Sequence, residues 1–239
     1  MNLPITQEFI DNNVDLNSSD VKHITFKYSD QLKNIFDLYI NNSIIDRKRL
    51  GTVAVTDSMA EFALGECAMV QNGNWSWSQV KTVKGSTVTA DDVAMMPIYM
   101  GLPNEENQGL AIGTENYYAI NSQATKAQQE NALNFIKWMY STPTGKDYVV
   151  NKMGFIAPFD TISDTEVPSD PLGVQVKQWM DNTSVNSTPW DFTVFPSQNF
   201  KNKLGQMFLR YAQGQKIWDQ LKQSTVDLWD SEYNSTPYE

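Results

Sequence analysis

The sequence has very few of the side chains that most metal centres and nucleophilic active sites use. Among its 239 residues there is one cysteine, Cys67, and one histidine, His23. A single cysteine excludes an internal disulfide, and these two residues are too few for a zinc site built from cysteine and histidine. A Ser–His or Cys–His catalytic pair would have to use His23, and no serine is marked as its partner. We therefore expect no metal, no other cofactor and no catalytic nucleophile.

Positive charge and long apolar runs are also scarce. The chain has 18 Lys and Arg against 28 Asp and Glu, a net charge of −10, and its one basic cluster, at 47–49, has the composition of a solvated turn. Nothing forms the basic stripe that nucleic-acid binding needs. No apolar run approaches the roughly 18 residues of a membrane span, and no phosphate-binding, dinucleotide-binding or HExxH motif is present. We therefore expect neither a nucleic-acid partner nor a membrane span.

Apolar spacing predicts helices and strands that alternate early in the chain and helices that dominate its final third. The first 20 residues favour a loop or a short helix. The predicted long helices cover residues 29–40, 57–64, 124–140, 141–152, 172–180, 197–212 and 217–233, and a predicted short helix carries Trp75 and Trp77. The predicted strands cover 21–27, 68–71 and 93–97, with two short pieces between 110 and 120. This alternation indicates an α/β fold.

Several motifs together resemble one known family. Residues 62–75 read FALGECAMVQNGNW: a helix that ends at a glycine, an Ala-Met strand, and a turn before a tryptophan. This order resembles the signature of extracellular solute-binding protein family 1, the sugar-capturing subunits of ABC importers, a group that includes maltose-binding protein. The turn Lys152–Pro158 and the closing segment Tyr211–Gly214 are similar to later motifs of that family. The resemblance covers the chain from about Val21 onward.

The resemblance implies a periplasmic-binding-protein-like fold of type II, represented mostly by its C-terminal lobe. It also implies that the chain is the C-terminal portion of a longer protein, whose signal and lipid anchor would lie in the preceding part. The implied location is extracellular, at the cell surface or in the periplasm. The implied division is a C-terminal-lobe segment (1–93), a hinge strand (94–98), a segment that belongs to the N-terminal lobe in the family (99–155), and the closing helices of the C-terminal lobe (156–239).

The implied function is the capture of a mono- or oligosaccharide for ABC permease membrane subunits, without chemistry. A sugar ring has an apolar face and a rim of hydroxyls, so its site needs aromatic platforms with polar groups at their edges. Trp75 matches the stacking tryptophan of the family, and Asn72 and Asn74 offer amides beside it. Trp77 could be a second contact, but two residues apart on a helix is a poor spacing for a shared face. The spacing favours Trp75 for the ligand and Trp77 for packing.

Two further places are candidate ligand contacts. Trp190, Asp191 and Phe192 form an aromatic–carboxylate–aromatic triple in a Pro-flanked loop, and this triple suits either a ligand or a loop anchored by a buried Trp190. Phe200 lies near the position where the family places an aromatic at the head of a closing helix. The remaining tryptophans lie on amphipathic helices at core-like spacing and are predicted to be structural: Trp138, Trp179, Trp218 and Trp229.

Two other classes of function remain open. A carbohydrate-active enzyme of the glycosidase type needs only two suitably spaced carboxylates, with Asp191 the first candidate and the pair Asp91–Asp92 the second. A scaffold domain of closing helices, without any small-molecule ligand, is the third possibility.

Overall fold

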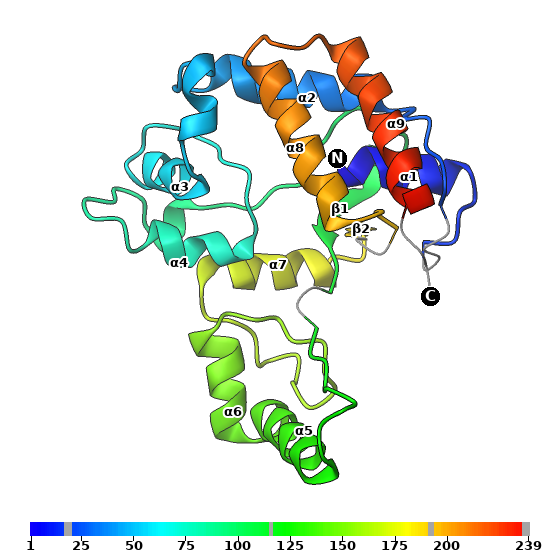
Figure 1. Cartoon of the computed structure of the whole chain (residues 1–239). Helices are drawn as coiled ribbons and strands as arrows, with labels where there is room; N and C mark the ends of the chain where they lie inside the picture. Colours follow the sequence, from blue (N-terminus) through cyan, green and yellow to red (C-terminus); the bar gives the residue numbers. More distant parts are fainter. Residues whose placement is uncertain (17–20, 115–116, 191–193, 236–239) are drawn as a thin grey trace. The chain divides into compact units, whose positions relative to one another are not determined.

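The computed structural model describes residues 1–16, 21–114, 117–190 and 194–235. The chain divides into two compact units, and Figure 1 labels the helices and strands that belong to them. Unit 1 consists of residues 1–54, 97–113 and 186–239, and unit 2 consists of residues 55–96 and 114–185. No helix within the described ranges is long and apolar enough to cross a membrane.

Unit 1 is mainly helical. Its longest two helices, α8 and α9, lie side by side (Figure 1). Ser197 begins α8 as its N-cap, because its hydroxyl accepts a hydrogen bond from the Phe200 amide at 2.9 Å. Gly214, with a φ of +73°, follows the end of α8 in the left-handed conformation that glycine adopts without strain. The helices of unit 1 are α1 (Asn2–Asp11), α2 (Ser29–Asn42), α8 (Gln198–Ala212) and α9 (Trp218–Ser235), with single turns η1 (Arg47–Thr52) and η4 (Glu105–Asn107).

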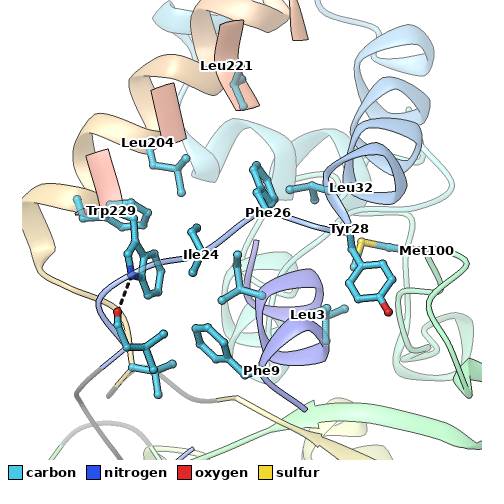
Figure 2. Packing of buried hydrophobic residues seen from close by; sticks show 14 of the residues in the cluster. Leu3, Phe9, Ile24, Phe26, Tyr28, Leu32, Met100, Leu204, Leu221 and Trp229 are labelled. Atoms are coloured by element: carbon cyan, nitrogen blue, oxygen red, sulfur yellow. Dashed lines mark hydrogen bonds between the residues drawn. The ribbon is translucent and has the colours of Figure 1, made fainter. Parts of the chain in front are cut away.

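One continuous hydrophobic core of aliphatic and aromatic side chains holds unit 1 together (Figure 2). Trp229 is completely buried, and its indole N–H donates to the Val21 carbonyl at 2.7 Å. The rings of Phe200 and Trp229 meet edge to face with their centroids 5.3 Å apart, and Phe9 meets Trp229 similarly at 6.0 Å. The predictions that Trp218 and Trp229 are structural are therefore confirmed.

The segment 21–27 shows the alternating burial of a strand but forms no strand. Ile24 and Phe26 point into the core, while the amides of Thr25 and Lys27 donate to the Glu8 carboxylate at 2.6 and 2.8 Å. A side chain on α1 therefore takes the hydrogen bonds that a neighbouring strand would take. The strand predicted here is wrong for that reason.

A short parallel sheet of two strands is the one sheet within the described residues. Strand β1 (Gln108–Ile112) pairs with β2 (Asn186–Pro189), with Gln108 opposite Asn186 and Ile112 opposite Pro189. The prediction of a strand in the 110–120 region is confirmed for β1. The pairing strand β2 was not predicted, because NSTP has no apolar alternation and contains Asn and Pro, which are rare in strands.

Unit 2 contains two small apolar clusters. One is formed by Met59, Ala63 and Val80, and the other by Met139, Tyr140 and Val149. Thr125 and Gln128 form a reciprocal capping box at the start of the longest helix, α5. The elements of unit 2 are α3 (Val55–Ala63), η2 (Asn74–Ser76), α4 (Trp77–Val80), η3 (Ala90–Asp92), α5 (Lys126–Ser141), α6 (Pro143–Asp147), a π-helical turn (Tyr148–Lys152) and α7 (Pro171–Asp181).

Two strands predicted in unit 2 are also replaced by irregular chain. Along 93–97, the Gln175 side chain on α7 accepts from the Met95 amide at 2.7 Å and donates to the Val93 carbonyl at 2.8 Å. Trp179 adds a bond from its indole N–H to the Met95 carbonyl at 3.2 Å, which is the structural role predicted for it. The segment 68–71 packs Val70 against α3 without forming a strand. A strand forms only where a second strand can pair with it, so an apolar run alone was not sufficient evidence for a strand at either place.

The described part of the chain therefore contains many helices and one small sheet, which is consistent with the expected α/β class. The type II lobe remains a prediction. The expected lobe segments remain a prediction, and the two compact units have boundaries at other positions. Trp138 corrects one expectation: it is 39% exposed, stacked on Phe135, which is 58% exposed. The helix α5 buries only its other side, through residues such as Ile136 and Met139.

Candidate functional site

Trp75 lies on the surface of unit 2, within the short turn η2. Its side chain is 57% exposed. A Cβ placed on Gly73 would lie 2.3, 2.3 and 2.6 Å from three consecutive atoms of the six-membered indole ring. Near-equal distances to three consecutive ring atoms place that point over the ring face and not at its edge. One face of the indole therefore covers Gly73, and the exposed area belongs to the rest of the ring.

The two asparagines beside Trp75 have different surroundings. The Asn72 side-chain oxygen accepts from the Gly73 amide at 2.9 Å, and its nitrogen lies 3.2 Å from the Met59 sulfur. Both ends of Asn72 are therefore engaged in fixing the turn. Asn74 is half-buried, and its side-chain amide has no hydrogen-bond partner within the described part of the chain. Of the two predicted amide contacts, Asn74 is the one available to a ligand.

Trp77 begins helix α4 and packs against the cluster of Met59, Ala63 and Val80. The prediction that Trp77 serves packing is confirmed. The turn η2 and the start of α4 send residues two apart to different sides, so Trp75 and Trp77 do not share a face. Trp75 is thus the exposed residue of the four, whereas Asn72, Asn74 and Trp77 are each half-buried.

A second polar surface in unit 2 lies on α7, the helix that packs against η2. A shallow pocket of about 260 Å³ is lined by Gln175, Gln178, Trp179 and Asn182. Gln175 and Trp179 are engaged with the 93–95 backbone. The Asn182 oxygen accepts from the Ser184 amide at 3.0 Å, while Gln178 is exposed. Sequence reasoning did not select these residues, although two amides four residues apart on a helix were a possible signal.

The other predicted contacts lie in unit 1 or outside the described residues. Trp190 is half-buried, and its amide donates to the Ile112 carbonyl at 3.0 Å, continuing the pairing of β1 with β2. Asp191 and its neighbour Phe192 lie outside the described residues. Phe200 is completely buried between Phe195 and Trp229 and presents no surface to a ligand in this structure.

The carboxylates considered for glycosidase chemistry do not form a described pair. Asp92 completes a capping box at η3: it accepts from the Thr89 amide at 2.8 Å and from the Thr89 hydroxyl at 2.7 Å. These bonds from Thr89 lower the pKa of Asp92. Its neighbour Asp91 is exposed. Within the described ranges, no group of three or more His, Cys, Asp or Glu residues could hold a metal ion.

Comparison with known proteins gives one match. The sequence profile of a family described as bacterial extracellular solute-binding protein matches residues 9–175, which is most of the chain and includes the Trp75 region. No curated protein and no solved structure matches the chain significantly. Solute-binding proteins are typically not enzymes. The chain belongs to the family of bacterial extracellular solute-binding proteins.

Proposed function

We propose that this chain captures a saccharide for an ABC importer and that Trp75 is its stacking platform. The observation that carries the proposal is the 57% exposed indole of Trp75, supported from one side by Gly73. An exposed tryptophan in a single fixed pose offers a flat apolar surface of the size of a sugar ring. The family match supports the role of solute receptor, and the saccharide is inferred from this surface.

The polar groups near Trp75 suit the hydroxyl rim of a sugar. The Asn74 amide can both donate and accept, and neither end has a partner in the described part of the chain. Asn72 has the indirect role of holding the turn, because both ends of its amide are engaged. The pocket on α7 adds the Gln178 amide as a candidate contact in the same unit.

The partners follow from the same proposal. An extracellular or periplasmic receptor would close over the sugar and present the closed form to the membrane subunits of a permease. In this scheme the binding energy comes from stacking and hydrogen bonds, and no covalent step is needed.

Intrinsic fluorescence and calorimetric titration with glucose, maltose, cellobiose and xylobiose test the proposal. We expect Trp75→Ala to weaken the binding of the responsive sugar about tenfold or more, which corresponds to about 1.4 kcal/mol. Trp138→Ala is the matched control, since Trp138 is also a partly exposed tryptophan of unit 2, and its affinity should stay within about twofold. Unchanged affinity in Trp75→Ala would remove Trp75 from the site. If none of the four sugars gave a fluorescence or calorimetric response, the result would argue against a saccharide as the ligand.

A further inference from the structure

Gly73 is a glycine for a reason that its backbone does not explain. Its φ of −106° and ψ of 178° belong to the extended region, which any residue adopts. The obstacle to a side chain at this position is the Trp75 ring: all three nearest atoms to a Cβ at Gly73 are indole atoms, at 2.3 to 2.6 Å. The Trp75 ring can therefore occupy this position only because residue 73 has no side chain.

We propose that Gly73 is a positioning residue that fixes the binding pose of Trp75. With no side chain at 73, the indole can fold back over the turn and cover the peptide backbone with one face. Any larger residue would push the ring away and let it rotate. The part of this inference that concerns ligand binding rests on the proposed function, whereas the part that concerns the ring pose does not.

The turn beneath the ring is itself held by several hydrogen bonds. Asn72 accepts from the Gly73 amide at 2.9 Å, and the Ser76 amide donates to the Gly73 carbonyl at 3.0 Å. The Ser78 hydroxyl donates to the Trp75 carbonyl at 2.9 Å. A ring seated on a fixed turn loses little freedom when a ligand stacks on it, which preserves affinity.

The geometry also restricts what the platform can hold. Because Gly73 covers one face of the indole, a ligand can stack only on the other face. We expect the site to take a pyranose by the side on which its C–H groups gather.

Other glycines of the chain show why Gly73 can be tested cleanly. At Gly113 a Cβ would meet the Trp190 backbone oxygen at 2.4 Å, so substitution there would disturb the main chain. At Gly73 the obstacle is a partly exposed side chain that can move into solvent. We therefore expect Gly73→Ala to fold. Gly205 on α8 is the matched control, because a Cβ there would meet nothing within 4 Å.

The ring pose can be measured without any ligand. The chain has seven tryptophans, so protein labelled with 5-fluorotryptophan should give seven ¹⁹F resonances, and loss of one in Trp75→Phe assigns Trp75. We expect Gly73→Ala to shift and broaden the Trp75 resonance and to leave the other six in place, while Gly205→Ala leaves the Trp75 resonance unchanged. A Trp75 resonance unchanged in Gly73→Ala would overturn the positioning role.

Affinity for the sugar that responds in the titration panel tests the functional part. We expect Gly73→Ala to weaken that affinity about threefold to tenfold, as expected for one side chain that must be ordered on binding. In a Trp75→Ala background the same change should have no further effect, since Gly73 acts through the ring. An additive effect in the double variant, or full affinity in Gly73→Ala despite a shifted resonance, would contradict the proposal. If the unmodified chain binds no sugar, the proposed function fails and the ¹⁹F result alone decides the ring pose.

Discussion

Trp229 in unit 1 and Trp75 in unit 2 lie in contrasting environments. In unit 1, Trp229 is completely buried, donates its N–H to the Val21 carbonyl at 2.7 Å, and touches a ring of other aromatic side chains. In unit 2, Trp75 is 57% exposed and Trp138 is 39% exposed. Unit 2 has two small apolar clusters where unit 1 has one continuous core.

This difference in burial distinguishes tryptophans that stabilise the fold from tryptophans that are available to bind a ligand. A buried tryptophan with its N–H satisfied contributes to the free energy of folding through area, packing and a hydrogen bond. An exposed tryptophan contributes little to folding and remains available to a ligand. The number of tryptophans in a sequence does not distinguish buried from exposed ones, because the position of each residue in the fold decides its burial.

The largest expected effect is on the buried side of the comparison. We expect Trp229→Ala to lower the free energy of unfolding by about 3–5 kcal/mol, because it leaves a large cavity and an unpaired Val21 carbonyl. Urea denaturation measures this loss. Trp75→Ala is the paired variant and should change stability by less than about 0.5 kcal/mol. Similar losses of unfolding free energy in Trp229→Ala and Trp75→Ala would contradict the proposed difference between a buried, stabilising tryptophan and an exposed one.

A second prediction concerns the buried carboxylate of Glu8 in unit 1. Glu8 is buried, and its carboxylate accepts from the amides on both sides of Phe26, whose φ is +53°. This strained backbone conformation needs outside support. We expect Glu8→Gln to lower the free energy of unfolding by about 2–3 kcal/mol, since one of the two part-buried amides loses the oxygen that accepts its hydrogen bond.

Urea denaturation again measures the change, with Glu106→Gln as the matched control. Glu106 is exposed in the same unit, so its effect should be within about 0.5 kcal/mol. An equally small loss in Glu8→Gln would mean that the carboxylate does not hold segment 21–27.

The smallest predicted effect is a sensitivity to acid that both units share. The Lys27 ammonium, which bonds Asp11 at 2.6 Å, together with Tyr28 lowers the pKa of Asp11 to about 2. In unit 2, the Ser163 amide and Lys146 lower the pKa of Glu166 to about 2. Depressed values mean that both carboxylates stabilise the fold above their ordinary values of 3.8 and 4.5 and lose this effect as pH falls toward 2.

Urea midpoints measured between pH 7 and pH 2 check this prediction. We expect Asp11→Asn and Glu166→Gln each to reduce the decline in stability below pH 4.5, by modest amounts because both groups are near solvent. A decline identical to that of the unmodified chain would show that neither ion pair contributes.

The helices could be predicted closely, whereas most strands could not. Each of the seven long predicted helices is present, and the predicted short helix with Trp75 and Trp77 corresponds to η2 and α4, because caps, glycine stops and 3.6-residue spacing are local signals. The failed strands at 21–27 and 93–97 have backbone groups that bond to Glu8 and to Gln175 and Trp179. A sequence pattern indicates which side chains are buried. It does not indicate whether the backbone of that segment forms hydrogen bonds with a neighbouring strand or with a side chain on a helix.

The candidate site was predictable in part for the same reason. The spacing of Trp75 and Trp77 correctly placed Trp77 in a cluster and left Trp75 outside. The difference between Asn72 and Asn74 was not visible, because it depends on the Met59 sulfur and the turn geometry. Phe200 reads as a surface aromatic near a helix start, yet Trp229 covers it from more than twenty residues away.

The sequence by itself determined the family, the helices and the scarcity of the cysteine and histidine residues that a zinc site would need. It did so because motif order, helical spacing and residue counts are properties of the chain alone. Tertiary structure decided which tryptophan is packed and which is exposed, and which carboxylates hold extended segments. Those properties depend on atoms brought together by folding, such as the indole of Trp229 and the carbonyl of Val21.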